Sequence, residues 1–150
     1  MPVPSGLNLR NKTAILYVSG GDHGPKLGQV LSEAGASVFV VARTQPILDD
    51  VLTYIDGDST SGCVLASPVD SDVEKVMDIF DKTYQSADVL VNDARSFFTK
   101  PFTAITSDEW QQIQARNVQI PFLLSQQVAS RMLKAKYGRI VNIVSVLAER

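Results

Sequence analysis

The sequence predicts an α/β fold, a doubly wound parallel sheet of about five strands in the order 3-2-1-4-5. Short apolar runs alternate along the chain with longer segments of helical period, as buried strands and crossover helices do. Each segment between two apolar runs is long enough for the right-handed crossover that parallel strands require. No internal repeat or low-complexity segment interrupts the pattern, so we expect residues 1–150 to form one domain.

The first expected strand spans residues 13–18, a nearly continuous apolar run bounded by Gly20 and Gly21. A run without polar alternation is typical of a strand that is buried on both faces. Four further runs of the same kind predict the other strands, at residues 38–41, 63–65, 88–91 and 139–144.

Helices are predicted where apolar residues recur at spacings of three and four. Four segments show this spacing: residues 27–34, 47–55, 73–80 and about 107–136. Thr106 and Glu109 form a capping-box pattern at the start of the last and longest segment. Pro121 falls inside that segment, and we expect it to bend the helix or to mark a boundary.

The composition is that of a globular protein with a sizeable core, because 45% of the 150 residues are hydrophobic. A net charge of −2 is too near neutral to indicate nucleic acid or an anionic membrane as partner. Residues 1–6 lack the layout of a signal peptide and no apolar run reaches membrane-spanning length, so we expect a cytoplasmic protein. Cys63 is the only cysteine, and we expect a buried, reduced thiol. His23 is the only histidine and is distant from Cys63 in sequence, so we expect no metal site.

The loop after the first expected strand contains the glycines of a nucleotide-binding turn. Residues 19–26 read Ser-Gly-Gly-Asp-His-Gly-Pro-Lys, which resembles the Thr-Gly-x-x-x-Gly-x-Gly loop of short-chain dehydrogenases/reductases. Further similarities follow in the order of that family, at residues 92–95, 116–118 and 137–145. They extend over nearly the whole chain. The resemblance implies a Rossmann-like domain that holds a nicotinamide dinucleotide for chemistry on a carbonyl or alcohol.

Several cofactor positions depart from the family pattern. The resemblance places the cofactor contacts at Ser19, Gly20, Gly24, Lys26, Arg43 and Asn92. Lys26 replaces the last glycine of the loop, Pro68 replaces an aspartate near the adenine, and Arg95 replaces a glycine near the ribose. Arg43 would suit the 2′-phosphate of NADP, although a solvated arginine at a strand end explains it at least as well. We therefore expect no tight dinucleotide binding, and NADP rather than NAD if any.

For catalysis, the resemblance identifies Ser145 and Asn117 as two members of the family's tetrad. The other two, a tyrosine and a lysine four residues later, would fall beyond Arg150. No other tyrosine of the chain has a lysine four residues after it. Without a proton donor of tuned pKa, hydride transfer to a carbonyl would leave an uncompensated alkoxide.

Three other features have both a functional and a structural interpretation. His23 could touch a phosphate, but an exposed loop histidine is the better account. Asp70 and Asp72 resemble a paired-carboxylate site, but a helix dipole favours acidic residues at its N-terminus, which explains them better. Phe97 and Phe98 could line a substrate pocket or pack their loop against the long helix.

The sequence favours a degenerate family member that is not catalytic by itself and acts as a subunit or scaffold. A last strand at residues 139–145 would lie uncovered at the sheet edge, and a partner chain would cover it. We expect pairing with an intact related reductase or with a second copy. One alternative is the front part of an NADP-dependent reductase, against which Pro68 and Arg95 count. Another is a sensor that binds NADP without turnover.

Overall fold

A parallel sheet of five strands forms the centre of the molecule, in the order β3-β2-β1-β4-β5. This computed structural model describes residues 8–55, 60–97 and 99–144. The arrangement confirms the predicted fold class and strand order. The strands are β1 (Thr13–Val18), β2 (Ser37–Ala42), β3 (Ser61–Val64), β4 (Val89–Asp93) and β5 (Arg139–Asn142).

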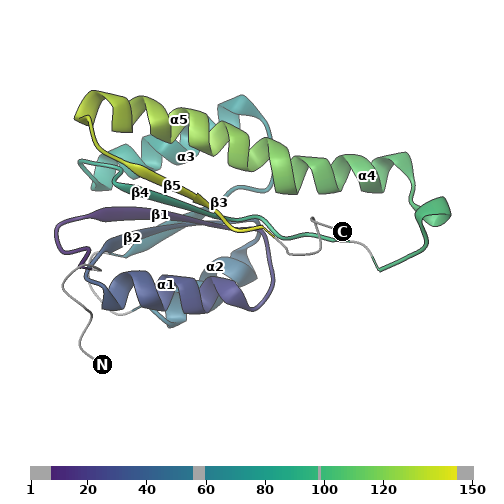
Figure 1. The fold of residues 1–150 in the computed structure, drawn as a ribbon, viewed down its shortest axis with the longest axis horizontal. Helices are drawn as coiled ribbons and strands as arrows, with labels where there is room; N and C mark the ends of the chain where they lie inside the picture. Colours follow the sequence, from purple (N-terminus) through teal and green to yellow (C-terminus); the bar gives the residue numbers. More distant parts are fainter. Residues whose placement is uncertain (1–7, 56–59, 98, 145–150) are drawn as a thin grey trace.

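Helices cover both faces of the sheet (Figure 1). On one face lie α1 (His23–Glu33) and α2 (Gln45–Thr53), and on the other lie α3 (Asp70–Thr83) and α5 (Ile120–Ala135). The helix α4 (Ser107–Gln114) follows the short 3₁₀ turn η2 (Phe102–Ala104) and projects past the carboxyl ends of the strands.

The core is divided by the sheet into two apolar clusters. Beneath α3 and α5, the rings of Phe39, Phe80 and Tyr84 pack together with centroids 5.1–5.8 Å apart. Beneath α1 and α2, the cluster is aliphatic and includes Val40 and Val51. Every residue of β1 is buried, as its continuous apolar run predicts.

The long predicted helix consists of three parts, because the π-helical turn η3 (Ala115–Gln119) joins α4 to α5. The predicted capping box is confirmed at the start of α4. Thr106 Oγ1 accepts from Glu109 N, and Thr106 N donates to Glu109 Oε2 over 2.9 Å. Pro121 lies in the first turn of α5, where its missing N–H costs little. The irregular turn therefore precedes the proline.

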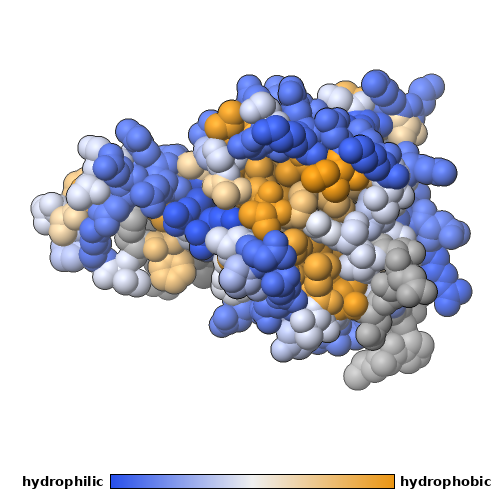
Figure 2. All heavy atoms as spheres, turned by 180° about the vertical axis from the view of Figure 1, so that it is seen from behind, coloured by the Kyte–Doolittle hydropathy of each residue, from blue (hydrophilic) through white to orange (hydrophobic). Residues whose placement is uncertain are grey.

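Both edges of the sheet are open to solvent along part of their length. All four residues of β5 are exposed, in line with the predicted uncovered last strand. Seen from the side of α2 and α3, apolar side chains appear at the middle of the molecule between more hydrophilic helical surfaces (Figure 2). Within the described residues, no helix has the length and apolarity to cross a membrane.

Candidate functional site

The candidate site lies at the carboxyl ends of β1 and β4, where the winding of the sheet changes direction. Such a switch point is where doubly wound sheets bind their ligands. The turn that leaves β1 contains Gly20 with φ +149° and Gly21 with φ +86°, which are conformations that side chains disfavour. The helix α1 begins at His23, so the glycine turn is confined to residues 19–22.

Two further predicted contact residues, Gly24 and Lys26, lie inside α1. Gly24 is buried, and a Cβ there would stand 2.7 Å from Val18 Cγ1. Gly28 is equally close to Ile55, so both glycines let α1 pack tightly on the sheet and on α2. Lys26 is exposed and donates to Gln29 Oε1 over 2.9 Å. In the described part of the chain, Gly24 therefore packs against β1 and α2, and Lys26 bonds within α1.

Ser19 ties the ends of β1 and β4 together. Its hydroxyl accepts from Arg95 N over 2.9 Å and donates to the Asp93 carbonyl over 3.3 Å. Its own carbonyl accepts from Arg43 Nε over 2.8 Å. The predicted contacts Ser19 and Arg43 are thus brought together, and the serine hydroxyl is committed to neighbouring backbone.

Arg95 occupies the space above the glycine turn. Its Nε and Nη2 donate to the two carboxylate oxygens of Asp93 over 2.5 and 3.2 Å. Asp93 is fully buried, and a Cβ on Gly21 would stand 3.7 Å from Arg95 Nη2. The guanidinium therefore lies against the turn that a pyrophosphate approaches in Rossmann-like folds. A bidentate pair with a buried carboxylate fixes it there.

A second side chain crosses the same end of the sheet. Gln119, in the π-helical turn η3, donates from Nε2 to the carbonyl of Pro68 over 3.0 Å. Pro68 follows β3, and the family resemblance places it on the adenine side. The bridge therefore joins η3 to the loop after β3 across this side.

Tyr17 is buried beneath the site in β1. Its hydroxyl has no hydrogen-bond partner among the described residues. Burial raises the pKa of Tyr17 to about 12, against an opposing effect of the charges of Arg43 and Arg116. A phenol with this pKa stays neutral and gives up its proton poorly at pH 7.

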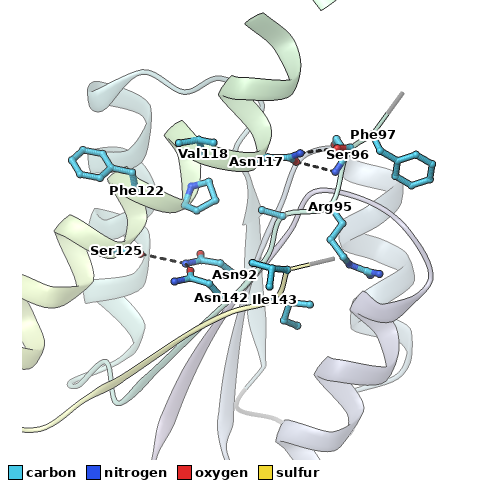
Figure 3. A pocket seen from close by; sticks show the side chains of 13 residues that line it. Asn92, Arg95, Ser96, Phe97, Asn117, Val118, Phe122, Ser125, Asn142 and Ile143 are labelled. Atoms are coloured by element: carbon cyan, nitrogen blue, oxygen red, sulfur yellow. Dashed lines mark hydrogen bonds between the residues drawn. The ribbon is translucent and has the colours of Figure 1, made fainter. Parts of the chain in front are cut away.

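A cavity of about 820 Å³ opens beside the site, between the carboxyl ends of β4 and β5 and the start of α5 (Figure 3). At its rim Asn117 clamps the loop after β4: Asn117 Nδ2 donates to Ser96 O over 2.6 Å, and Ser96 N donates to Asn117 Oδ1 over 2.9 Å. Asn117, which was predicted as a tetrad residue, therefore binds the backbone of Ser96. Phe97 lines the cavity, whereas Phe98 and the predicted Ser145 lie outside the described residues.

Three polar side chains from different elements meet at this cavity. Asn92 Nδ2 donates to Asn142 Oδ1 over 2.8 Å and to Ser125 Oγ over 3.3 Å. The predicted contact Asn92 is only 1% exposed, and its Oδ1 has no partner among the described residues. Sequence reasoning missed Asn142 and Ser125. Asn142 lies opposite Asn92 in the register of β4 and β5, so the two side chains point to the same face of the sheet. The alternation of side chains along the two predicted strands was the available signal for Asn142.

The other side chains considered in the sequence analysis are explained by their places in the fold. His23 is exposed at the first residue of α1. Asp70 and Asp72 lie in the first turn of α3, where the helix dipole favours them. Cys63 is a half-buried free thiol whose pKa is raised by burial to about 11. Within residues 8–55, 60–97 and 99–144, no cluster of three or more His, Cys, Asp or Glu side chains could hold a metal.

Known proteins with similar sequences and folds agree with this architecture. The 3-oxoacyl-(acyl-carrier-protein) reductase FabG of Vibrio cholerae is 28% identical over 141 residues, which cover 94% of this chain and 57% of that enzyme. A gluconate 5-dehydrogenase of Burkholderia cenocepacia, solved with NADP and tartrate, superposes with a TM-score of 0.82 at 27% identity, over 96% of this chain and 57% of the other. A protein of Agrobacterium tumefaciens that is assigned as a gluconate dehydrogenase gives a TM-score of 0.84 at 25% identity, over 96% of this chain and 58% of the other.

The chain therefore spans a little over half the length of the relatives it matches. The model of the short chain dehydrogenase family matches residues 14–150, which include the glycine turn, the Asn92 and Asn117 positions and the strand β5. The sheet order, the glycine turn at the switch point and this match lead to one conclusion: the chain belongs to the short-chain dehydrogenase family.

Proposed function

We propose that this chain is a family member whose dinucleotide crevice is filled by its own side chains. It is not catalytic by itself and acts as a subunit or scaffold in a larger assembly. The observation that carries the proposal is the position of Arg95, which lies against the glycine turn and is paired with the fully buried Asp93.

The cost of opening this crevice can be estimated. A pyrophosphate needs the glycine turn and the first N–H groups of the following helix to be free. Moving Arg95 aside would strand the Asp93 carboxylate in the interior, and breaking a buried ion pair in this way costs about 3–5 kcal/mol. That cost weakens binding by roughly a hundredfold to several thousandfold. The Gln119 bridge to Pro68 adds a further contact that an adenine would have to displace.

The subunit role is supported by the surface of the long helical segment. Apolar side chains that are more than half exposed occur along α4, η3 and α5: Trp110, Val118, Phe122 and Leu133. A helix face of this kind, together with the exposed strand β5, is suited to contact with another protein chain. The partner would be an intact related reductase or a second copy of this chain.

A second candidate function is the front part of an NADP-dependent oxidoreductase acting on a carbonyl or alcohol. Arg43 favours it, because this cation lies at the end of β2, where a 2′-phosphate is held in NADP-binding relatives of the fold. The span of just over half of each relative also fits a part of a longer enzyme. A sensor that binds NADP without turnover would share the same crevice.

Titration of the purified chain with NADPH, followed by cofactor fluorescence, separates these functions. The scaffold proposal expects no saturation at millimolar NADPH. Micromolar binding would refute it and would favour the reductase or the sensor. Native mass measurement of the protein purified from its source tests the subunit role, for which a mass equal to that of the single chain is the contrary result.

A further inference from the structure

The strand β3 forms an unprotected edge of the sheet. Among the described strands it pairs with β2 alone, and its residues Ser61–Val64 include no charged side chain and no proline. Charged side chains and prolines are common devices that prevent an edge strand from pairing with another chain. Seen from the side of α2 and α3, which both contact β3, a band of apolar side chains lies between hydrophilic helical surfaces (Figure 2). This edge is therefore open to a further strand.

The register of β3 determines which of its backbone groups face outward. Leu65 N donates to Ala42 O over 2.8 Å, at the point where the chain leaves β2. In a parallel ladder, alternate residues of a strand direct both backbone groups to the same neighbour. Cys63, two residues before Leu65, therefore also faces β2, whereas the N–H and C=O groups of Gly62 and Val64 face away from the sheet. In the described part of the chain, these four groups have no hydrogen-bond partner.

The helices on the two sides of this edge are acidic. The helix α2 contains two aspartates and neither lysine nor arginine, and α3 contains five acidic residues against two lysines. In α2, Leu48 lies against Gly62 of β3, whereas Val51 lies against Gly24 of α1. The helical period therefore places Asp49, which follows Leu48, on the flank of α2 that is turned away from α1. The negative charge beside β3 favours a cationic partner and disfavours a second copy of the same edge.

We propose that β3 binds an extended, cationic segment of another protein, which adds a strand to the sheet. The outward backbone groups of Gly62 and Val64 hold this strand, and its alternate apolar side chains cover the exposed Val64 and the adjacent band. Lysine or arginine residues at its ends lie near the acidic residues of α2 and α3. The strand β3 is at the opposite edge from β5, and no dinucleotide is required, so the inference goes beyond the proposed scaffold role.

The probe is a capped hexapeptide in which valine and threonine alternate between two terminal lysines, titrated into the full chain and followed by backbone ¹H–¹⁵N correlation spectra. We expect the amide signals of Gly62 and Val64 to shift until saturation, whereas that of Val141 on the opposite edge strand should not. The same peptide with terminal glutamates should bind about tenfold more weakly. A version with all four central amides methylated should not bind. Absence of saturable shifts at Gly62 and Val64, or equal affinity for the glutamate peptide, would overturn the proposal.

Two variants separate the contributions of backbone and charge. Val64→Pro removes an outward N–H that β2 does not use, so the edge strand should tolerate it, and the Kd of the lysine peptide should rise at least about tenfold. Asp49→Lys reverses a charge beside the edge and should raise this Kd about fivefold. Glu33→Lys is the matched control on α1, with the same change of charge, and should leave the Kd unchanged. An unchanged Kd in folded Val64→Pro, or equal effects of the two charge reversals, would contradict the proposal.

A second copy of the chain is the competing occupant, and Cys63 detects it. Antiparallel pairing of Gly62 with Val64 of the second copy would place the two Cys63 residues opposite one another, with Cα atoms about 4.5 Å apart. This separation lies within the range that a disulfide spans, so mild oxidation would trap a cross-linked dimer. After oxidation we expect the denatured, non-reduced protein to have the mass of a single chain. A disulfide-linked dimer whose formation the lysine peptide suppresses would overturn the proposed occupant.

Discussion

Removing Arg95 alone should destabilise the protein far more than its partly exposed side chain suggests. The Arg95 side chain is 22% exposed, whereas its partner Asp93 is fully buried. Arg95→Ala leaves that carboxylate without its cation, and we expect a loss of about 3–5 kcal/mol in the free energy of unfolding. Asp93→Asn removes the buried charge and leaves a cation that can reach solvent, so we expect a smaller loss of about 1–3 kcal/mol.

The double variant Asp93→Asn/Arg95→Ala should lose less than the sum of the two single changes, with a coupling of at least about 2 kcal/mol. The assay is urea unfolding followed by far-ultraviolet circular dichroism, with the four proteins analysed as a double-mutant cycle. Arg131→Ala is the matched control, because that arginine forms a bidentate pair with the exposed Asp81, and about 1 kcal/mol or less is expected. Strict additivity, or a loss for Arg95→Ala no larger than for Arg131→Ala, would refute the reasoning.

Three further predictions concern packing, a buried hydroxyl and pH. Gly24→Ala should destabilise the fold by about 1–3 kcal/mol in urea unfolding, because the added Cβ meets Val18 at 2.7 Å; a neutral outcome would show that α1 can shift. Tyr17→Phe should be neutral or stabilising by up to about 1 kcal/mol in the same assay, because the buried Tyr17 hydroxyl has no partner among the described residues; a clear loss would reveal a partner. Glu109 has its pKa lowered from 4.5 to about 2, chiefly by the hydrogen bond from Lys100, and also by those from the capping residue. A carboxyl whose pKa is lower in the folded than in the unfolded state stabilises the fold at pH values above its unfolded-state pKa. The stabilisation by Glu109 is therefore complete above pH 4.5 and is lost as the pH falls toward 2. The urea midpoint of Glu109→Gln should therefore vary less than that of wild type across this window, and identical pH profiles would contradict the assignment.

The architecture could be predicted because each of its causes is local in sequence. Continuous apolar runs predict β1 and β4 as buried strands, and the alternation of such runs with helical segments predicts the parallel crossovers. The capping box is a contact between Thr106 and Glu109, which are three residues apart, and this prediction is confirmed. The π-helical turn could not be predicted in the same way. The sequence indicates a helix irregularity only at Pro121, but the structure accommodates this proline in the first turn of α5, and the π-helical turn precedes it.

The candidate site was predictable in part. Its glycine turn and Asn117 were recognised through family motifs, and Arg95 was identified as a departure from them. That Arg95 would be held by Asp93, two residues earlier, depends on the backbone path at the end of β4, which sequence spacing does not specify. The link from Asn92 to Ser125 joins residues 33 apart, so it emerges only after α5 has packed on the sheet.

The central claim is that Arg95, held by Asp93, keeps a dinucleotide out of the crevice. It is tested most directly by titrating NADPH into Asp93→Asn/Arg95→Gly alongside wild type, because this pair of changes empties the space above the glycine turn without stranding a buried charge. The account predicts that the double variant binds NADPH at least about tenfold more tightly than wild type, a gain of about 1.4 kcal/mol. Equal affinities in the two proteins, or micromolar binding already in wild type, would contradict it.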